Sequence, residues 1–235
     1  MKNKSPNKIA IFFLFYLFTI PMNSYSVEIT ENMELKDVYE EHCKEPSDIN
    51  EHLPVLCSLA KECATVVEIG LRGMVSSWGI LEGLAENTAT TRSYIGIDLY
   101  TPPDRILNAA KKLSNTHGIS FRFWQANDLY ITIPPADMLF IDSLHTYIHL
   151  TYELEKFSPF ISKYIAMHDT SEPWGNVEDD YYQGDYSEYP GFWDRKKKGL
   201  WPAVKDFLER HPEWVLYERR FNNHGFTILK RISEE

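Results

Sequence analysis

The sequence predicts an α/β fold in which a mainly parallel β-sheet carries helices on both faces. Short runs of apolar and β-branched residues alternate with longer segments whose apolar residues recur at helical spacing. Strands of a parallel sheet are apolar on both sides, because the crossover helices cover both faces. Near the C-terminus the alternation stops, and two extended runs flanking residues 222–225 predict an antiparallel hairpin.

The individual elements follow from the same patterns. A helix before the first strand is expected to open at Asp48, which has Glu51 at capping-box spacing, and to end near Lys61. Gly70 ends the first strand, and Gly118 follows another helix as a C-terminal stop. The strands are expected at 65–69, 94–98, 121–125, 138–142, 164–167, 214–219 and 226–230. The further helices are expected at 76–86, 104–116, 148–157 and 201–210. Together they predict a Rossmann-like, seven-stranded, mostly parallel sheet with a C-terminal antiparallel hairpin.

Residues 1–26 differ from the rest of the chain. Lysines precede a 14-residue apolar run over 9–22, and no acidic residue occurs before Glu28. This pattern predicts a secretory signal peptide, because the run is shorter than the ~20 residues that span a bilayer comfortably. A membrane anchor is the alternative. We therefore expect an exported or membrane-anchored protein, with membrane association through 9–22; an anchor that leaves the domain in the cytosol is the alternative localisation.

The remaining chain is expected to form one domain with an N-terminal extension. Residues 27–62 predict a helical lead-in, and residues 63–235 predict the main domain. Residues 170–199 interrupt the alternation and predict an ordered lid, because so long a loop in a compact domain is usually functional. Its aromatic residues are Trp174, Tyr181, Tyr182, Tyr186, Tyr189, Phe192 and Trp193.

The net charge argues against one class of partner. The formal net charge is −10, and the only dense basic run is 195–198. Proteins that bind the phosphate backbone need clustered Lys and Arg. We therefore expect no nucleic-acid partner.

Polar residues stand at the carboxyl end of nearly every expected parallel strand. Ligands of open parallel sheets bind at this edge, and carboxylates there are costly to bury unless they find partners. The pattern therefore predicts a site for hydroxyls, amines or a cation. The residues concerned are Glu68, Gly70, Asp98, Asn127, Asp128, Asp142, His145, His168 and Asp169.

The turn after the first strand narrows the ligand class. Residues 70–73 read Gly-Leu-Arg-Gly, which lacks the G-x-G-x-x-G spacing of a pyrophosphate-binding dinucleotide site. Glu68 would repel a pyrophosphate and suits a ligand with a positive centre. Asp98 can accept hydrogen bonds from ribose hydroxyls, which nicotinamide cofactors and S-adenosylmethionine share.

Two stretches resemble the first motifs of class I S-adenosylmethionine-dependent methyltransferases. Residues 66–78, VVEIGLRGMVSSW, are similar to the first motif, and residues 96–99, GIDL, to the second. The resemblance implies S-adenosylmethionine as the cofactor. Glu68, Gly70 and Ser76 would line its methionine end, Asp98 would hold the ribose, and Asp128 would face the adenine.

Further stretches resemble a metal-dependent group that includes macrolide-sugar O-methyltransferases and proteins labelled cephalosporin hydroxylases. They are FIDSLHTY at 140–147, MHD at 167–169, GLWPAVKDFL at 199–208 and NNHGFTIL at 222–229. The resemblance covers about residues 60–231.

This second resemblance implies a divalent cation and a general base. Asp142 and Asp169 would bind the cation, Mg²⁺ by analogy, with His168 as a further candidate ligand and His145 as the base. Relatives often carry an acidic pair where this chain has His168-Asp169, and magnesium prefers carboxylates. The resemblance also implies the reaction, methyl transfer to a hydroxyl of a small-molecule or glycan acceptor such as a sugar. An inactive S-adenosylmethionine-binding module and a nicotinamide-dependent oxidoreductase are the alternatives, and the acceptor and oligomeric state are left open.

Overall fold

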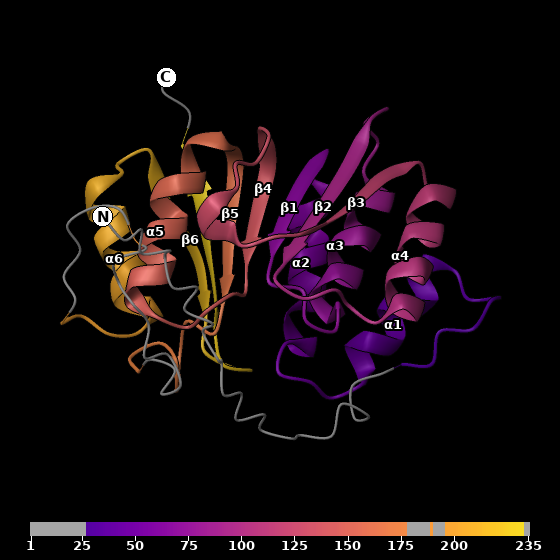
Figure 1. Cartoon of the computed structure of the whole chain (residues 1–235), viewed down its shortest axis with the longest axis horizontal. Coiled ribbons are helices and arrows are strands. Elements are labelled where there is room, and N and C mark those ends of the chain that lie inside the picture. The colour runs from indigo at the N-terminus through magenta and orange to yellow at the C-terminus, as the bar shows by residue number, and fades with distance from the viewer. Residues whose placement is uncertain (1–26, 178–188, 190–195, 233–235) are drawn as a thin grey trace, which may run out of the picture.

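The structure is a computed structural model that describes residues 27–177, 189 and 196–232 (Figure 1). Its centre is a seven-stranded sheet in the order β3-β2-β1-β4-β5-β7-β6. Strands β1 to β5 pair in parallel, and β7 and β6 add antiparallel pairs. The strands are β1 (Thr65–Ile69), β2 (Arg92–Asp98), β3 (Ile119–Gln125), β4 (Ala136–Ile141), β5 (Ile161–His168), β6 (Trp214–Arg220) and β7 (Phe226–Arg231). The predicted fold class, including the C-terminal hairpin, is confirmed.

Helices cover both faces of the sheet. They are α1 (Leu35–Lys44), α2 (Leu53–Lys61), α3 (Val75–Glu86), α4 (Asp104–Thr116), α5 (Tyr147–Phe157) and α6 (Leu200–Arg210). Helices α1 to α4 lie by the β1–β3 half, whereas α5 and α6 lie by the other half (Figure 1). Neighbouring residues of a strand pack into the hydrophobic cores on opposite faces of the sheet. Val66 packs in the core with α1 to α4, and Val67 packs in the core with α5 and α6. This alternation is the two-residue period of a strand covered on both sides.

The register brings four strand ends to one level. Ile69 of β1 pairs with Ile97 of β2 and with Ile141 of β4, and Ile141 pairs with Met167 of β5. The residues that follow these positions therefore meet at one edge of the sheet, the lower edge in Figure 1. Between β3 and β4, residues 126–135 contain only a short 3-10 turn, η2 (Asp128–Tyr130), in place of a crossover helix.

The predicted capping box at Asp48 and Glu51 is wrong. The α-helix begins later, at Leu53, after the 3-10 turn η1 (Asn50–His52). Ahead of this turn, the Ser47 Oγ accepts hydrogen bonds from the backbone N–H groups of Ile49 at 3.3 Å and Asn50 at 2.9 Å.

The prediction of an exported or membrane-anchored protein is corrected. Among the described residues, no helix combines the length and the apolar character needed to cross a bilayer. The apolar run 9–22, on which the prediction depended, lies outside the described residues. So does much of the predicted lid, of which the structure describes 170–177, Tyr189 and 196–199.

Candidate active site

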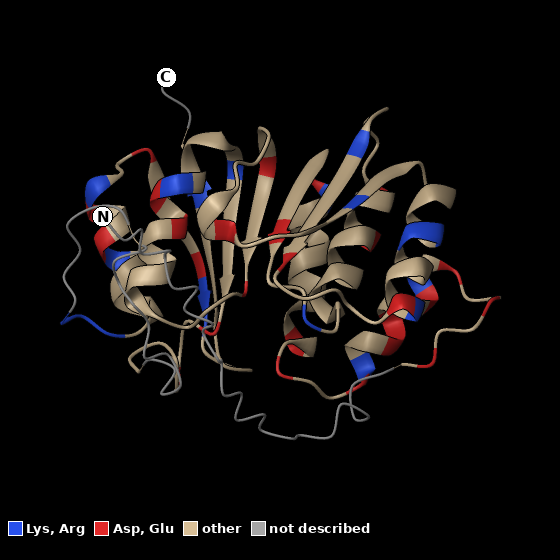
Figure 2. Cartoon of the chain, viewed as in Figure 1, with Lys and Arg blue, Asp and Glu red and all other residues tan. Residues whose placement is uncertain are grey.

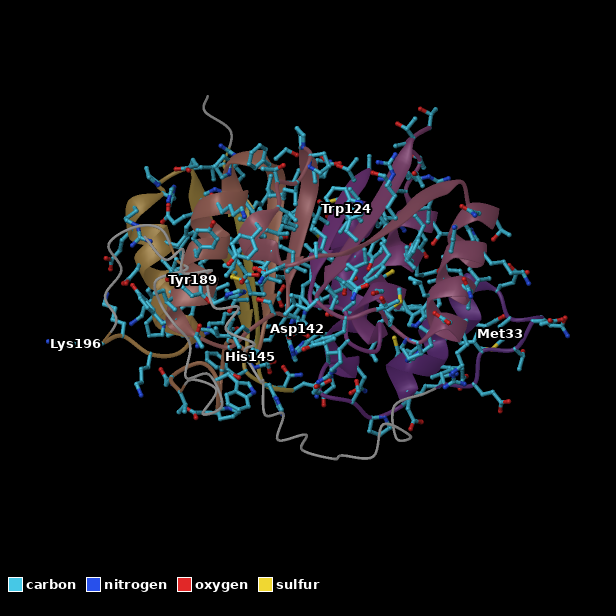
Figure 3. All side chains as sticks on the ribbon, in the orientation of Figure 1. Met33, Trp124, Asp142, His145, Tyr189 and Lys196 are labelled. Carbon is cyan, nitrogen blue, oxygen red and sulfur yellow. The ribbon has the colours of Figure 1, made fainter. Side chains whose placement is uncertain are left out.

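The polar residues predicted from strand ends do gather at one edge of the sheet. Figure 2 shows acidic residues at the lower edge, where the parallel strands end. Figure 3 shows Asp142 and His145 near one another at this edge, with Tyr189 on the α5 side. Two groups of side chains can be distinguished, one around the β1 turn and one around Asp142.

Gly70 lets the ends of β1 and β4 meet. Its φ is +85°, and a Cβ at this position would lie 2.0 Å from the carbonyl oxygen of Asp142. The Gly70 N–H donates to the carbonyl of Ile97, and the Asp142 N–H donates to that of Ile69, both at 2.9 Å. Only glycine combines this backbone conformation with such a close approach.

Asp98, at the end of β2, holds the turn that follows Gly70. Its Oδ2 accepts hydrogen bonds from the backbone N–H groups of Leu71 at 2.7 Å and Arg72 at 3.0 Å. Its Oδ1 accepts one from Tyr100 at 2.9 Å. The carboxylate also lines an open pocket, formed by Arg72, Asp98, Tyr100, Thr101 and Pro103. Each carboxylate oxygen can accept more than one hydrogen bond, so Asp98 can hold the turn and still accept from a ligand.

Glu68 and Ser76 lie beneath this turn in the protein interior. The Glu68 side chain is fully buried, and its carboxylate accepts hydrogen bonds from Ser76, Ser77 and Tyr94. Burial raises the pKa of Glu68 to about 7, although these hydroxyls favour the ionised form. The observed contacts tie Glu68 to the start of α3 and to β2, and its contact with a cofactor stays a prediction.

The second group joins the ends of β4 and β5. His145 Nε2 lies 2.9 Å from Asp169 Oδ2 and 3.7 Å from Asp142 Oδ1. His168 Nδ1 lies 3.3 Å from Asp169 Oδ2 and 3.5 Å from Asp142 Oδ1. Ligating atoms of Asp142, His168 and Asp169 all lie within 4.8 Å of one another, which makes them a candidate metal site.

Charge interactions in this group outweigh burial. Burial raises the pKa of the Asp142 carboxyl, but the His168 and His145 rings hold it well below its usual range. Burial lowers the pKa of His168, but Asp142 and Asp169 raise it to about 10. Each buried carboxylate is therefore ionised at neutral pH and has a cationic or hydrogen-bonding neighbour.

Trp174, from the described part of the predicted lid, packs against the site. Its ring stacks on that of His145 with centroids 5.3 Å apart and planes 24° apart. The His145 side chain keeps 19% of its surface exposed. An acceptor that reaches His145 therefore has an aromatic surface beside it.

Asp128 lies in a separate buried group that the sequence did not reveal. Its Oδ2 is 3.0 Å from His149 Nε2, and His149 Nδ1 is hydrogen-bonded to the hydroxyl of Tyr189 at 2.8 Å. Glu153 lies 3.7 Å from His149, and its two carboxylate oxygens are 2.8 Å from the Ser143 hydroxyl that donates to them. Burial raises the pKa of Glu153 to about 8. The predicted contact between Asp128 and adenine stays a prediction; the observed partner is His149.

Solved structures of similar fold include O-methyltransferases. TomG, an O-methyltransferase from Streptomyces achromogenes solved with S-adenosylmethionine, has a TM-score of 0.53 and 13% identity, covering 88% of this chain and 93% of its own. An O-methyltransferase from Bacillus cereus, solved with S-adenosylhomocysteine, has a TM-score of 0.51 and 14% identity, covering 88% and 94%. A Corynebacterium glutamicum protein has a TM-score of 0.54 and 18% identity, covering 88% and 93%.

No protein-family model matches the sequence, and no curated protein does either. At these identities the structural likeness concerns the fold alone. The Rossmann-like fold predicted from the sequence is confirmed on this basis.

Proposed function

We propose that this protein, which has a methyltransferase-like fold, is an S-adenosylmethionine-dependent O-methyltransferase. Its acceptor is a hydroxyl of a small molecule or sugar. The observation that carries the proposal is the position of His145, which lies against Asp169 and remains partly exposed beside Trp174. Two of the solved structures of similar fold hold S-adenosylmethionine or its demethylated product, which supports the choice of cofactor.

Methyl transfer to a hydroxyl has two requirements that the protein must meet. A sulfonium methyl group is already electrophilic, so the acceptor oxygen must be placed in line with it. A hydroxyl is a weak nucleophile until a base removes its proton. When Nε2–H of neutral His145 donates to Asp169, the proton-accepting lone pair of the ring is on Nδ1. Nδ1 is buried, so the side chains around the ring have to move before an acceptor hydroxyl reaches it. Asp169 then orients the ring and stabilises the imidazolium formed when the proton arrives.

The turn of residues 70–73 and Asp98 would bind the cofactor. Asp98 lines the open pocket next to the turn and can accept hydrogen bonds from ribose hydroxyls. Tyr100, which is 61% exposed at the same pocket, offers an apolar surface to the adenine. Glu68 would act from beneath by holding Ser76 at the start of α3.

The residues at the candidate metal site fit Mg²⁺ poorly. Asp142 and Asp169 supply carboxylates, but His168 stands where magnesium would favour a third oxygen ligand. Acceptor deprotonation is therefore assigned to His145 alone.

Binding and turnover test the proposal separately. Calorimetry of the full chain should show binding of S-adenosylmethionine and no comparable binding of NAD, whereas the opposite result would support the oxidoreductase alternative. A screen of sugars and small phenols with radiolabelled cofactor should identify an acceptor. Cofactor binding without transfer to any acceptor would favour an inactive binding module.

The role of His145 is then tested by His145→Ala. Loss of a general base should lower kcat by ~10²–10⁴, with cofactor affinity nearly unchanged. The matched control is His211→Ala, because the His211 ring pairs with Glu155 and Glu213, and it should retain normal kcat. Wild-type kcat in His145→Ala would refute the assignment.

A further inference from the structure

We propose that the cluster of Asp142, His168 and Asp169 binds a first-row transition-metal dication through the His168 imidazole, in preference to Mg²⁺. This inference rests on the proposed function only for the role of the ion in methyl transfer, because ion binding can be measured without turnover. It is carried by the orientation of His168, by the donor atoms at the site and by the way the chain holds them.

The His168 ring is oriented as metal-binding histidines are. Its Nε2 lies 3.0 Å from the backbone carbonyl oxygen of Asn223, to which it can donate. When a metal ion displaces the Nδ1 proton, that hydrogen bond leaves the ring lone pair on Nδ1, which lies 3.5 Å from Asp142 Oδ1 and 3.3 Å from Asp169 Oδ2. The ring is buried, and apart from these ion-pair contacts Nδ1 has no hydrogen-bond partner among the described residues. Histidine ligands of metals usually donate their second N–H to a carbonyl or carboxylate in this way.

The surrounding donors favour the same class of ion. Magnesium takes oxygen ligands in octahedral geometry, whereas imidazole suits iron, zinc, nickel and related ions. The donors that can share one ion are the two carboxylates and the His168 imidazole, whereas His145 and His224 pair with Asp169. A set that includes an imidazole nitrogen resembles the ligands of transition-metal centres more than those of magnesium.

The turn that orients His168 is itself held by the N-terminal segment. Asn223 has a φ of +47°, a conformation that asparagine tolerates. Its Nδ2 donates to the backbone carbonyl of Ser47 at 2.9 Å, and its Oδ1 accepts from the Glu51 N–H at 3.3 Å. His52 Nε2 lies 3.0 Å from the carbonyl of the neighbouring Asn222. These contacts fix the carbonyl that selects the His168 tautomer.

The test compares two ions on the metal-free full chain. Co²⁺ binding is followed by its visible absorption, and Mg²⁺ by its competition with Co²⁺. Most nitrogen-containing sites prefer Co²⁺ to Mg²⁺, so a preference for Co²⁺ in the wild-type chain is not enough. The decisive measurement is how much that preference changes when His168 is replaced. His168→Asp should reduce the ratio of Mg²⁺ to Co²⁺ dissociation constants by at least about 10-fold, the scale of changes at metal-site residues. His211→Ala, a histidine paired with Glu155 and Glu213, should leave the ratio unchanged.

A spectroscopic measurement on the unmodified chain complements the substitution. With Mn²⁺ bound, pulsed electron paramagnetic resonance should detect an imidazole nitrogen, and His168→Asp should remove or weaken that signal. Absence of any Co²⁺ or Mn²⁺ binding would overturn the inference and indicate that protonated His168 serves as the cation. Metal binding without a nitrogen signal, or an unchanged ion ratio in His168→Asp, would overturn it as well. Because these readouts need no cofactor, they can fail while S-adenosylmethionine binding succeeds, and the reverse also holds.

Discussion

Replacing Gly70 with alanine should separate the strand ends on which the candidate site is built. The added Cβ would lie 2.0 Å from the carbonyl oxygen of Asp142 and 2.5 Å from its carbonyl carbon. Both atoms are backbone, so no side-chain rotation can relieve the contact. Relief requires the β1 turn or the start of the β4–α5 connection to move, and Asp142 moves with it.

The cost has two parts. The left-handed conformation of Gly70, with φ at +85°, costs an alanine about 1–2 kcal/mol. Forcing extra volume into a packed region costs about 1–3 kcal/mol. Restriction of the unfolded chain returns about 0.4–1 kcal/mol. We therefore expect the free energy of unfolding to fall by about 2–4 kcal/mol, which lowers Tm on the order of 10 °C for a domain of this size.

Urea denaturation followed by circular dichroism measures this loss, with Gly73→Ala as the matched control. A Cβ at Gly73 would meet no atom within 4 Å, so its substitution should change the free energy of unfolding by less than about 0.5 kcal/mol, or raise it slightly. Calorimetry should also show weaker S-adenosylmethionine binding for Gly70→Ala alone. Equal stability and equal cofactor affinity of the two variants would refute the account of the β1 turn.

Three further predictions concern single side chains. Burial raises the pKa of Glu68 from 4.5 to about 7, so between these pH values the folded state binds more protons than the unfolded state and its stability falls as pH rises. Urea titrations at pH 5 and pH 8 should therefore show that Glu68→Gln gains relative to wild type at the higher pH, by the order of 2–3 kcal/mol; a pH-independent difference would contradict this. Asp98→Asn should weaken S-adenosylmethionine binding by about 1–3 kcal/mol in calorimetry, because it loses charged hydrogen bonds; unchanged affinity would remove Asp98 from the cofactor site. Trp174→Ala should raise KM for the acceptor in steady-state kinetics while leaving cofactor affinity intact, because Trp174 stacks on His145; a loss confined to cofactor binding would place Trp174 elsewhere in the mechanism.

The fold could be predicted because each strand carries its own signal. Runs such as 65–69 and 138–142 are apolar over their whole length, and only a strand covered on both faces needs that pattern. Strand ends were harder to predict. β5 begins at Ile161, three residues before the prediction, because Ser162 and Lys163 are exposed at its start and look like a turn.

Part of the site could also be predicted from topology. Asp142 and Asp169 follow neighbouring parallel strands, so the fold alone brings them together. His224 could not be placed in this way. Its turn reaches Asp169 only because β7 lies between β5 and β6, an order that local sequence does not specify.

His149 and Glu153 were missed for a different reason. Polar residues four apart on a predicted helix normally indicate a solvated face. Here residues 126–135 replace the crossover helix and bring Asp128 against α5, so that face is buried. The signal available in the sequence was the length of this connection, which is too short for a helix of ordinary length.

Two groups of acidic and histidine side chains therefore flank the β4–α5 connection, one with Asp142 and His145 and one with His149 and Glu153. They differ in how much of their side-chain surface is exposed to solvent. Asp142 and His145 keep 21% and 19% of their side-chain surface exposed, whereas His149 and Glu153 keep 7% and 0%. Both ring nitrogens of His145 are nevertheless buried, so an acceptor that approaches the exposed part of the first pair reaches the base only after the surrounding side chains shift. The buried group instead anchors the connection, because Glu153 accepts a hydrogen bond from Ser143, the residue directly after Asp142. A base works only if its ring is held in position, and the buried group supplies that support for the residues around His145.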